Sequence, residues 1–434
     1  MTTPLRIGIA GLGTVGRGTL KALRDNQDVL KARCGRALQP VAVAARDKRK
    51  DRGVSLDGVR WHDDPLALAS DPDVDVVVEV IGGSDGIAKA LCEAAIARRK
   101  HVVTANKALL AHHGTALARA AEAAGVTLAF EAAVAGGIPI IKALREGLAG
   151  NRVERVYGIL NGTSNYILTA MREHEREFAD ALAEAQALGY AEADPSFDVD
   201  GVDTAHKLAL LTSAAFGCEV NFAAVHMEGI RHVSLADIQF AEELGYRIKL
   251  LGIARQTDYG IEQRVHPCMV PLEDPIAHVE DVFNAVVVDG NLTGTTMYEG
   301  RGAGEGPTAS AIVADLVDIA RGRGLPSFGV PAKALRPMTA APMERHRGAY
   351  FIRLMVVDRP GIFAAVAATL RDHQISMESV LQRGRAPGEV VPVVMTVHET
   401  EEAAMIKAID TIAHHDGIVE RPRLIRIESF ERRP

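Results

Sequence analysis

The residues best suited to chemistry are a lysine and the acidic residues that precede it. Residues 189–207 read Gly-Tyr-Ala-Glu-Ala-Asp-Pro-Ser-Phe-Asp-Val-Asp-Gly-Val-Asp-Thr-Ala-His-Lys, with five carboxylates before Lys207. Asp203 and Lys207 are four residues apart, so they share one face of a helix predicted over 201–216. An ordinary helix salt bridge remains the alternative. A calcium loop is disfavoured, because the EF-hand ligand order and its closing glutamate are absent.

We interpret this cluster as a site that binds a substrate ammonium group through carboxylates, including Asp198 and Asp203, and that transfers a proton. Hydride addition to an aldehyde leaves an alkoxide, which needs a proton and a nearby positive charge. A lysine ammonium supplies both, and burial can move its pKa toward the working pH.

A second lysine occupies a promising position. Lys107 lies in Thr104-Ala-Asn-Lys, just after a strand predicted over 101–104. Ligands of open α/β sheets gather at the carboxyl ends of the strands. Lys107 could therefore meet a cofactor or a substrate carbonyl. A surface cation in the first turn of a helix is the alternative interpretation.

A phosphate-binding turn is predicted near the start of the chain, at Gly11-Leu12-Gly13-Thr14-Val15-Gly16. It follows a strand predicted over 5–10 and precedes a helix predicted over 14–30. In this pattern the first glycine permits the tight turn, the second lets the backbone approach a pyrophosphate, and the third allows close helix–strand packing. Free N–H groups at the helix start favour the phosphate. A glycine-rich turn without a ligand is the alternative.

The end of the second predicted strand, 40–45, indicates the type of dinucleotide. It is followed by Arg46-Asp47-Lys48-Arg49-Lys50. A carboxylate at this point binds the ribose of NAD, whereas an arginine pairs with the 2′-phosphate of NADP. Because Arg46 comes first and three further cations follow, we predict NADP over NAD. Asp47 keeps NAD possible, and the basic run could be a solvated loop.

The elements that must position these residues fall into three groups. Strands over 5–10, 40–45, 74–81, 101–104 and 126–130 alternate with helices over 14–30, 86–99 and 113–124, which predicts a Rossmann-type doubly wound parallel sheet. A mixed α/β part follows, with strands near 247–255, 262–270 and 282–289, a glycine-rich turn at 300–306 and a helix over 308–322. The tail is predicted to be βαββαβ, or ferredoxin-like, with strands over 350–357, 376–382, 390–398 and 418–428 and helices over 362–373 and 400–414.

The expected domains are a dinucleotide-binding domain over 1–130, to which 300–325 returns, and a substrate-binding and dimerisation domain over 131–300. A proline-rich linker over 326–348 and a regulatory domain over 349–434 complete the chain. A length of 434 residues fits two or three domains.

The bulk composition excludes several classes of protein. With 47% hydrophobic and 24% charged residues, a soluble folded protein is expected, and a net charge of −7 argues against broad nucleic-acid binding. No signal peptide or membrane span is recognised, so the cytoplasm is the expected location. Four cysteines, Cys34, Cys92, Cys218 and Cys268, form neither a CxxC pair nor a Cys/His cluster in the sequence. We therefore expect reduced thiols, without a zinc site.

Several motifs in order resemble the homoserine dehydrogenase family along nearly the whole chain. They are Gly11–Gly16, Val-Glu-Val-Ile-Gly-Gly at 78–83, Thr-Ala-Asn-Lys at 104–107, Phe-Glu-Ala-Ala-Val-Ala-Gly-Gly-Ile-Pro-Ile-Ile at 130–141, Asn-Gly-Thr-Ser-Asn-Tyr at 161–166, Glu-Ala-Asp-Pro at 192–195, the stretch ending at Lys207, Gly-Ala-Gly at 302–304 and Pro-Thr-Ala at 307–309. The resemblance implies reversible, NAD(P)-dependent interconversion of L-aspartate 4-semialdehyde and L-homoserine. This reaction is a step toward threonine, methionine and isoleucine.

The resemblance also implies roles for individual residues. Lys207 resembles the proton donor and acceptor of the family, and Lys107 resembles its second active-site lysine, near cofactor and substrate. Substrate contacts are implied for Glu192, Asp203 and Thr163, and cofactor contacts for Ser84, Gly189 and Gly304. The family binds a sodium ion through backbone carbonyls, which here would be those of Glu131, Val134, Gly136 and Ile138. Ala135 stands where the common pattern has glycine.

The tail resembles an ACT domain through Tyr-Phe-Ile-Arg-Leu at 350–354, Asp-Arg-Pro-Gly at 358–361 and Ser-Val-Leu-Gln at 379–382. Such domains often pair and bind an amino acid at their shared edge, so threonine is a possible effector and a homodimer or homotetramer is expected. A structural dimerisation unit is the alternative. Neither membrane nor nucleic acid is an expected partner.

Two competing interpretations stay open at this point. An aldehyde reductase resembling aspartate-semialdehyde dehydrogenase would share the glycine turn, but it would need a nucleophilic cysteine. A non-catalytic amino-acid sensor would use the tail and a vestigial cofactor domain, although the intact Lys107 and Lys207 argue against it.

Overall fold

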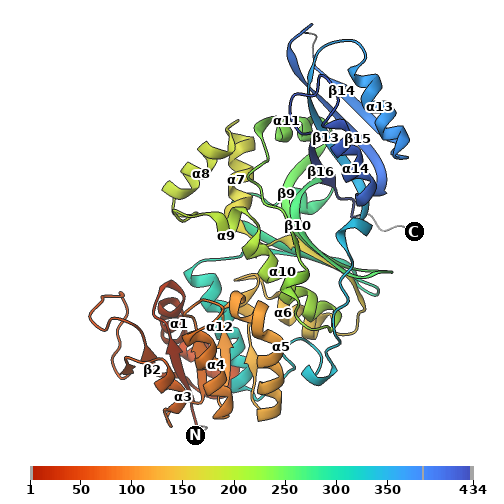
Figure 1. Ribbon diagram of the computed structural model, residues 1–434. Coiled ribbons are helices and arrows are strands. Elements are labelled where there is room, and N and C mark those ends of the chain that lie inside the picture. The colour runs from red at the N-terminus through yellow and green to blue at the C-terminus, as the bar shows by residue number, and fades with distance from the viewer. Residues whose placement is uncertain (1–2, 384–385, 431–434) are drawn as a thin grey trace.

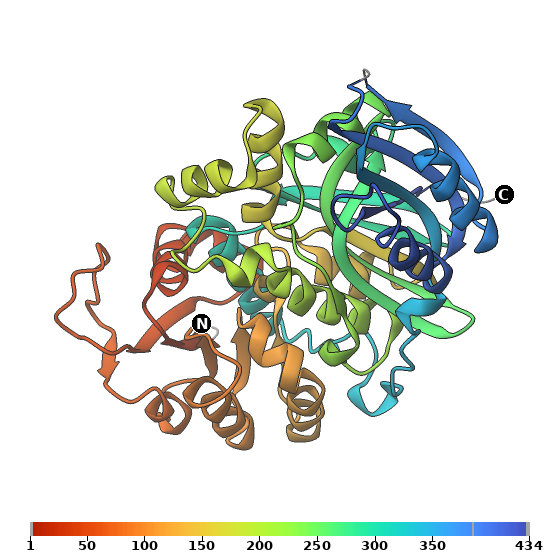
Figure 2. The same ribbon diagram turned by 45° about the horizontal axis from the view of Figure 1, so that its top comes forward.

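The computed structural model describes residues 3–383 and 386–430. Residues 1–2, 384–385 and 431–434, which belong to the expected first and last domains, lie outside the described residues. A parallel sheet with its helices lies at one end of the molecule, and the C-terminal helices and strands lie at the other (Figure 1). A second, larger sheet runs between them, as the turned view also shows (Figure 2). Among the described residues, no helix is long and apolar enough to cross a membrane.

The N-terminal sheet is a doubly wound parallel sheet, as predicted. Its order is β3-β2-β1-β4-β5-β6, with every pairing parallel. The bounds are β1 Leu5–Ala10, β2 Leu38–Ala44, β3 Arg60–His62, β4 Val76–Glu79, β5 His101–Thr104 and β6 Leu128–Ala129, with helices α1 Thr14–Asp25, α2 Gln27–Cys34, α3 Leu66–Ser70, α4 Ile87–Ala97 and α5 Lys107–Ala124. The strand order reverses between β1 and β4, which is the place where ligands bind in such sheets.

Two helices of this sheet differ from the sequence prediction. The helix expected over 14–30 is two helices, because Asn26 leaves the helical conformation (φ −108°, ψ 19°) between α1 and α2. Helix α5 begins at Lys107, six residues before the predicted start, because the Asn106 side chain caps it by accepting the Leu109 N–H. This cap places Lys107 directly at the end of β5.

The second sheet has ten strands and extends into the C-terminal part of the chain. Its order is β12-β11-β7-β9-β10-β16-β13-β15-β14, and β8 pairs with β10. The bounds are β7 Val153–Ile159, β8 His226–Met227, β9 Tyr246–Thr257, β10 Gly260–Pro271, β11 Phe283–Gly290, β12 Gly294–Arg301, β13 Arg347–Val357, β14 Met377–Gln382, β15 Val390–Glu401 and β16 Arg423–Ile427. The helices of these parts are α6 Ile140–Lys142, α7 Gly162–Glu173, α8 Phe178–Ala187, α9 Ser196–Val199, α10 Val202–Phe216, α11 Leu235–Glu243, α12 Glu305–Ala320, α13 Ile362–Asp372 and α14 Glu402–Ile412.

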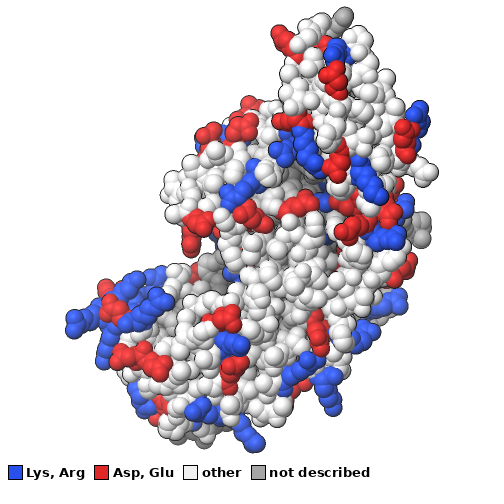
Figure 3. All heavy atoms as spheres, in the orientation of Figure 1, with Lys and Arg blue, Asp and Glu red and all other residues white. Residues whose placement is uncertain are grey.

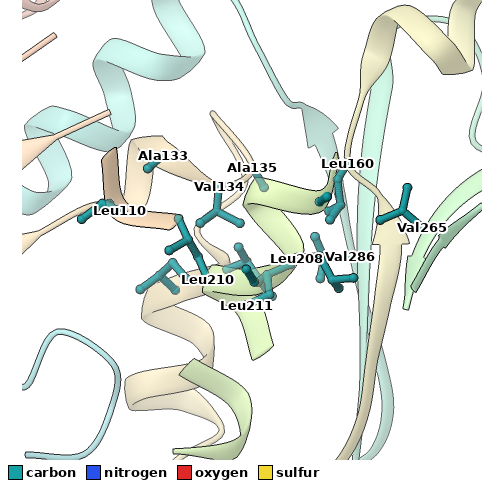
Figure 4. Packing of buried hydrophobic residues seen from close by; sticks show 14 of the residues in the cluster. Leu110, Ala133, Val134, Ala135, Leu160, Leu208, Leu210, Leu211, Val265 and Val286 are labelled. Atoms are coloured by element: carbon teal, nitrogen blue, oxygen red, sulfur yellow. The ribbon is translucent and has the colours of Figure 1, made fainter. Parts of the chain in front are cut away.

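Helix α10 is buried along most of its length and forms the centre of the molecule. Leu208, Leu210 and Leu211 are each fully buried. Figure 4 shows them between Leu110 of α5, the turn at 133–135 and sheet residues Val265 and Val286. Dense packing of this kind holds side chains in single rotamers. The functional face of α10 is therefore fixed relative to both sheets.

The last four strands and α13 and α14 follow in the βαββαβ order predicted for the tail, with strand order β16-β13-β15-β14. The sequence did not indicate that this sheet joins the central one. Strand β16 pairs in parallel with β10 through Cys268–Arg426 and Met269–Ile427. The two parts of the chain therefore share backbone hydrogen bonds as well as side-chain contacts.

The segment expected to be a linker, residues 326–348, packs against other parts of the chain. Phe328 is buried with its ring centroid 5.0 Å from that of Phe130. Farther on, the Ile261 N–H donates to the Thr339 carbonyl over 2.8 Å. The backbone of Gly260 lies so close to Thr339 that an added Cβ would be 2.4 Å from the carbonyl oxygen.

Buried charges join β10 to β16. The Arg264 side chain is 1% exposed and forms ion pairs with Glu262 and Glu428. Folding brings His266, Cys268 and Glu428 together, a proximity that the spacing of the cysteines in the sequence did not indicate. The Arg264 Nη1 lies 2.7 Å from the His266 Nε2. The Arg264 guanidinium therefore places a positive charge against both His266 and Glu428.

Replacement of Arg264 is predicted to destabilise the protein strongly. An Arg264→Leu variant leaves two buried carboxylates without their common partner, which costs ~3–5 kcal/mol of unfolding free energy. Urea denaturation measures this loss. Arg371→Gln is the control, because Arg371 pairs with its exposed neighbour Asp372; equal midpoints for the two variants would contradict the prediction.

Candidate active site

The glycine turn between β1 and α1 has the close contacts that its pattern requires. Gly11 has φ +99°, and a Cβ at this residue would lie 2.6 Å from the Val80 carbonyl oxygen. A Cβ on Gly16 would lie 1.9 Å from the Gly11 carbonyl oxygen. At Gly13, by contrast, a Cβ would meet nothing within 4 Å. Backbone atoms crowd the first and third glycines, whereas the space beside the second is open. A pyrophosphate could therefore approach the backbone at Gly13.

A cavity of about 540 Å³ extends from this turn to the end of β2. Three cations line it, Arg46, Lys50 and Arg52. The Asp47 carboxylate also lies there, but it accepts the Arg49 N–H of its own loop over 2.8 Å. Figure 3 shows the Lys and Arg side chains gathered on the projecting loop after β2. Cations at this strand end suit the 2′-phosphate of NADP.

The ends of β4 and β5 are tied together by a buried carboxylate. Glu79 accepts the Thr104 hydroxyl over 2.6 Å and the Ile81 N–H over 2.7 Å. The Asn106 side chain donates to the Gly83 carbonyl over 2.7 Å. These bonds fix the loop after β4 against the start of α5. The glycine turn, which packs against Val80, and the start of α5 are therefore both attached to the loop after β4.

One carboxylate holds both candidate lysines. The Lys207 Nζ lies 2.8 Å from Asp203 Oδ2, and the Lys107 Nζ lies 3.2 Å from Asp203 Oδ1. The two lysines come from different parts of the chain, since Lys107 begins α5 beside the first sheet and Lys207 lies on α10. The structure thus brings together the three residues that the sequence singled out. It also shows that both oxygens of Asp203 are occupied by lysine ammonium groups.

Burial sets the acid–base properties of this group. The Lys207 ammonium is buried and also donates to the Leu160 carbonyl over 2.6 Å. Burial lowers the pKa of Lys207 below its usual range, and the Asp203 carboxylate opposes this shift. The pKa of Asp203 is lowered by the two ammonium groups despite its burial. An Asp203 carboxylate with a lowered pKa therefore faces a buried lysine whose pKa also lies below its usual range.

Asn161 positions a second carboxylate beside the first. Its side-chain nitrogen donates to Asp198 over 2.7 Å and to Asp203 over 2.8 Å, while its oxygen caps α7 by accepting the Ser164 N–H. Burial raises the pKa of Asp198. Within residues 3–383 and 386–430, Asp198 Oδ2 has no hydrogen-bond partner. This oxygen is available to a bound ammonium group.

The other predicted substrate and cofactor residues make their contacts outside this hydrogen-bonded cluster. The Thr163 hydroxyl donates to the Tyr190 carbonyl over 2.7 Å, which ties α7 to the loop that holds Gly189 and Glu192. The Glu192 side chain is exposed and, in the described part of the chain, makes no ion pair. Gly189 and Gly304 have φ +76° and +115°, and Gly304 lies at the start of α12, whose Glu305 pairs with Arg17 of α1. The Ser84 hydroxyl donates to Asp85 in the loop after β4.

The segment expected to bind sodium is a tight buried turn. Gly136 has φ +54°, and a Cβ there would lie 2.2 Å from the Gly302 carbonyl oxygen. Val134 and Ile138 are buried, and the Ile138 carbonyl accepts the Ile140 N–H over 2.8 Å. The Glu131 carboxylate accepts two N–H groups at the start of α6, and burial raises its pKa to about 7. Backbone oxygens in a buried turn are a donor set that suits a hard cation.

The four cysteines lack the properties of a catalytic nucleophile. All are free, and Cys92, Cys218 and Cys268 are buried. Burial raises the pKa of each thiol, including Cys34, and that of Cys218 to about 11. A nucleophilic cysteine needs a lowered pKa. This result disfavours the thioester chemistry of the competing aldehyde-reductase interpretation.

Sequence reasoning missed three residues that shape the site. Asn161, Glu79 and Asn106 hold the Asp203–lysine cluster and its supporting loops through buried hydrogen bonds. Only their places within the family-like motifs could have indicated them, since a lone asparagine or glutamate carries no periodic signal.

Comparison with protein families and known structures gives a consistent result. Family models match residues 11–131 as the NAD-binding domain of homoserine dehydrogenase, 139–317 as homoserine dehydrogenase and 350–414 as an ACT domain. A homoserine dehydrogenase of Neisseria gonorrhoeae is 45% identical, with 98% of this chain and 99% of the relative covered.

Solved structures agree with these relatives. The crystal structure of a homoserine dehydrogenase from Thiobacillus denitrificans superposes with a TM-score of 0.93 at 46% identity, covering 98% of each chain. A hyperthermophilic archaeal homoserine dehydrogenase in complex with NADPH superposes with a TM-score of 0.62 at 26% identity. That match covers 73% of this chain and 97% of the archaeal one.

Proposed function

The chain belongs to the homoserine dehydrogenase family of oxidoreductases, and on that premise we propose that it interconverts L-aspartate 4-semialdehyde and L-homoserine with NADP(H). The observation that carries this proposal is the Asp203 carboxylate, which holds Lys107 and Lys207 at the end of the parallel sheet. We place the reaction in the biosynthesis of threonine, methionine and isoleucine, in the cytoplasm.

Lys207 is the proposed proton donor and acceptor. When NADP(H) is bound beside the glycine turn, it supplies or accepts the hydride. In the oxidation of homoserine, neutral Lys207 accepts the hydroxyl proton of the substrate. In the reverse direction its ammonium form returns that proton to the substrate oxygen. The buried position supports this role, because it lowers the pKa of the amine toward the working pH.

Lys107 and the acidic residues orient the substrate. Lys107 is one-third exposed and begins α5 directly after β5, a position that supports a role in stabilising negative charge on the substrate oxygen. Asp198 has a free oxygen for the substrate ammonium group, and Glu192 and Thr163 are further proposed contacts. Asp203 acts through the two lysines that it holds, in addition to its expected role in substrate binding.

The proposed cofactor is NADP, held by Gly11–Gly16 and Arg46, with Ser84, Gly189 and Gly304 as further contacts and NAD as the weaker alternative. The cations around the cavity at the end of β2 support this preference. The NADPH found in the archaeal relative is consistent with it. A sodium ion on the carbonyls of Glu131, Val134, Gly136 and Ile138 would fix the turn between the two sheets.

We further propose the division of the chain set out above, with cofactor, substrate and ACT regulatory domains. Threonine is the proposed feedback effector of the ACT domain, and a homodimer or homotetramer is the proposed assembly. The strand edges of the second sheet support self-association, because unpaired backbone groups favour pairing with another chain.

The proposal is tested by absorbance at the nicotinamide band with L-homoserine and either cofactor. Homoserine-dependent formation of NADPH, with a lower KM for NADP than for NAD, is expected. An absence of any homoserine-dependent reduction would instead favour a non-catalytic amino-acid sensor. An equal or lower KM for NAD would overturn the cofactor preference alone.

The Lys207→Ala substitution is predicted to lower kcat by ~10²-fold or more, because the proton acceptor is lost. Lys207→Arg keeps the positive charge but cannot release its proton, so it should be equally impaired in homoserine oxidation. Steady-state kinetics measure both variants, with the exposed Lys333→Ala as control. A near-normal kcat in either Lys207 variant rejects the proton-transfer role.

The pH dependence should reflect the lowered pKa of Lys207. Homoserine oxidation needs the neutral amine, so its kcat rises with pH through this pKa, while reduction of the semialdehyde falls. Asp203→Asn removes the carboxylate that raises the pKa of Lys207, so both profiles should move to lower pH. Asp200→Asn is the matched control, since Asp200 pairs with Arg231. Unchanged profiles in Asp203→Asn would contradict the coupling.

The proposed contact of Arg46 with the 2′-phosphate of NADP can be tested by two substitutions within one loop. Arg46→Ala should raise the KM for NADP by ~10-fold or more and leave the KM for NAD nearly unchanged, because one charged contact to the 2′-phosphate is lost. Arg49→Ala carries the same charge change on the same loop but lies outside the cavity lining. Equal effects of the two substitutions would show that only the overall loop charge matters.

A further inference from the structure

We propose that Phe197 is a positioning residue for the reaction, whose ring holds the Lys107 ammonium group in place beside Asp203. The Lys107 Nζ lies over this ring, 5.7 Å from its centroid. An aromatic face carries partial negative charge and attracts a cation within about 6 Å. Phe197 acts through Lys107 and needs no contact with the substrate, so its part in catalysis rests on the proposed function.

Lys107 needs a second point of attachment more than Lys207 does. The Lys207 side chain is 10% exposed and donates to both Leu160 and Asp203. The Lys107 side chain is 33% exposed, and its ion pair with Asp203 is longer, at 3.2 Å. A single, partly exposed ion pair restrains a long, flexible side chain only weakly. A charge that stabilises negative charge as it develops must already be in place. The Phe197 ring supplies this further restraint.

A row of aromatic rings holds Phe197 in turn. The rings of Phe197 and His206 have centroids 5.5 Å apart, and those of His206 and Phe222 are 4.4 Å apart. His112 meets His206 and Phe222 edge-on, at 5.7 Å and 5.2 Å. Tilted and edge-on pairs at such distances attract each other. His112 lies on α5, the helix that Lys107 begins. The row therefore starts beside α5, crosses α9 and α10, and returns to α5.

The central ring of this row is an uncharged imidazole at neutral pH. His206 is buried, and its burial, followed by the neighbouring His112, lowers its pKa to about 4. Its Nδ1 is buried without a hydrogen-bond partner among residues 3–383 and 386–430. His206 therefore serves the row chiefly through its ring contacts. As a neutral group it adds no positive charge that would repel Lys107.

Helix α9 is held by contacts that do not involve the Phe197 ring. The Asn161 side chain donates to the Asp198 carboxylate over 2.7 Å, and Arg231 pairs with Asp200. Phe197 itself is 41% exposed, so its ring adds less to the packed interior than a buried ring would. Removal of the ring should therefore leave α9 and Asp198 in place. Its effect should fall on Lys107.

The kinetic test compares two substitutions in the full-length protein. Phe197→Leu removes the ring but keeps an apolar side chain, and it should lower kcat for homoserine oxidation by ~2–5-fold, as expected for one exposed cation–π contact. The KM for homoserine should stay nearly unchanged, because Lys107 acts on charge that develops in the transition state. Phe197→Tyr keeps a ring and should retain the wild-type kcat. Phe363→Leu is the matched control, since Phe363 is 44% exposed on α13.

A change confined to the electrons of the ring separates positioning from packing. Replacement of Phe197 by trifluorophenylalanine keeps the shape of the ring but withdraws negative charge from its face. This variant should lose kcat as Phe197→Leu does, while its Tm stays that of the wild type. It also keeps the test decisive if Phe197→Leu fails to fold.

The hold on Lys107 can be measured without turnover. An amine-directed reagent labels Lys107, and mass spectrometry follows the rate of labelling. An ammonium group released from the ring should be labelled ~2-fold faster or more in Phe197→Leu and in the trifluorophenylalanine variant. Phe197→Tyr and Phe363→Leu should be labelled as the wild type is. If the wild type does not oxidise homoserine, the proposed function fails, and labelling still decides whether Phe197 holds Lys107.

Four results would overturn the role of Phe197. The first two are a wild-type kcat in the trifluorophenylalanine variant and an equal loss of kcat in Phe197→Tyr and Phe197→Leu. The third is an unchanged rate of Lys107 labelling in Phe197→Leu. The fourth is a raised KM for homoserine at an unchanged kcat, which would mean that the ring shapes the substrate site near Asp198 instead.

Discussion

The sharing of one buried carboxylate by two ammonium groups is the interaction on which the rest of the site depends. Asp203 lies on α10, and its lysine partners come from α10 and from the start of α5. The pair of contacts joins the first sheet to the second at the point where we propose that cofactor and substrate meet. The Asp203 carboxylate also opposes the effect of burial, which lowers the pKa of Lys207. The cap at Asn106 and the packing of α10 serve to hold this geometry.

Much of the fold could be predicted from the sequence because its signals are local. Runs such as Val76–Glu79 are apolar and β-branched, and glycines mark the turn after β1. The βαββαβ order of the tail follows from similar patterns. Lys107 and Lys207 could be recognised because their positions, after a parallel strand and on a helix beside carboxylates, each have a chemical interpretation.

Other features could not be predicted, because they depend on residues far apart in the sequence. Helices α7, α8 and α11 and strands β7 and β12 were not identified. Asn161 gains its role only when α7 meets α10, 42 residues along the chain. The cluster of His266, Cys268 and Glu428 forms only through the pairing of β10 with β16. Pairing between strands that lie about 150 residues apart does not alter the residue pattern of either strand, so the sequence does not reveal it.

The pairing of β10 with β16 also affects how this protein could have acquired its tail. A module attached by a flexible tether can be exchanged between genes without regard to its host. Here the added domain completes the host's own sheet and places Glu428 against Arg264 in the interior. A transplanted tail without a matching acid would remove one of the two buried carboxylates, Glu262 and Glu428, that pair with Arg264. We therefore expect the two halves of this junction to be inherited together, so that chimaeras between distant relatives fold only when both are exchanged.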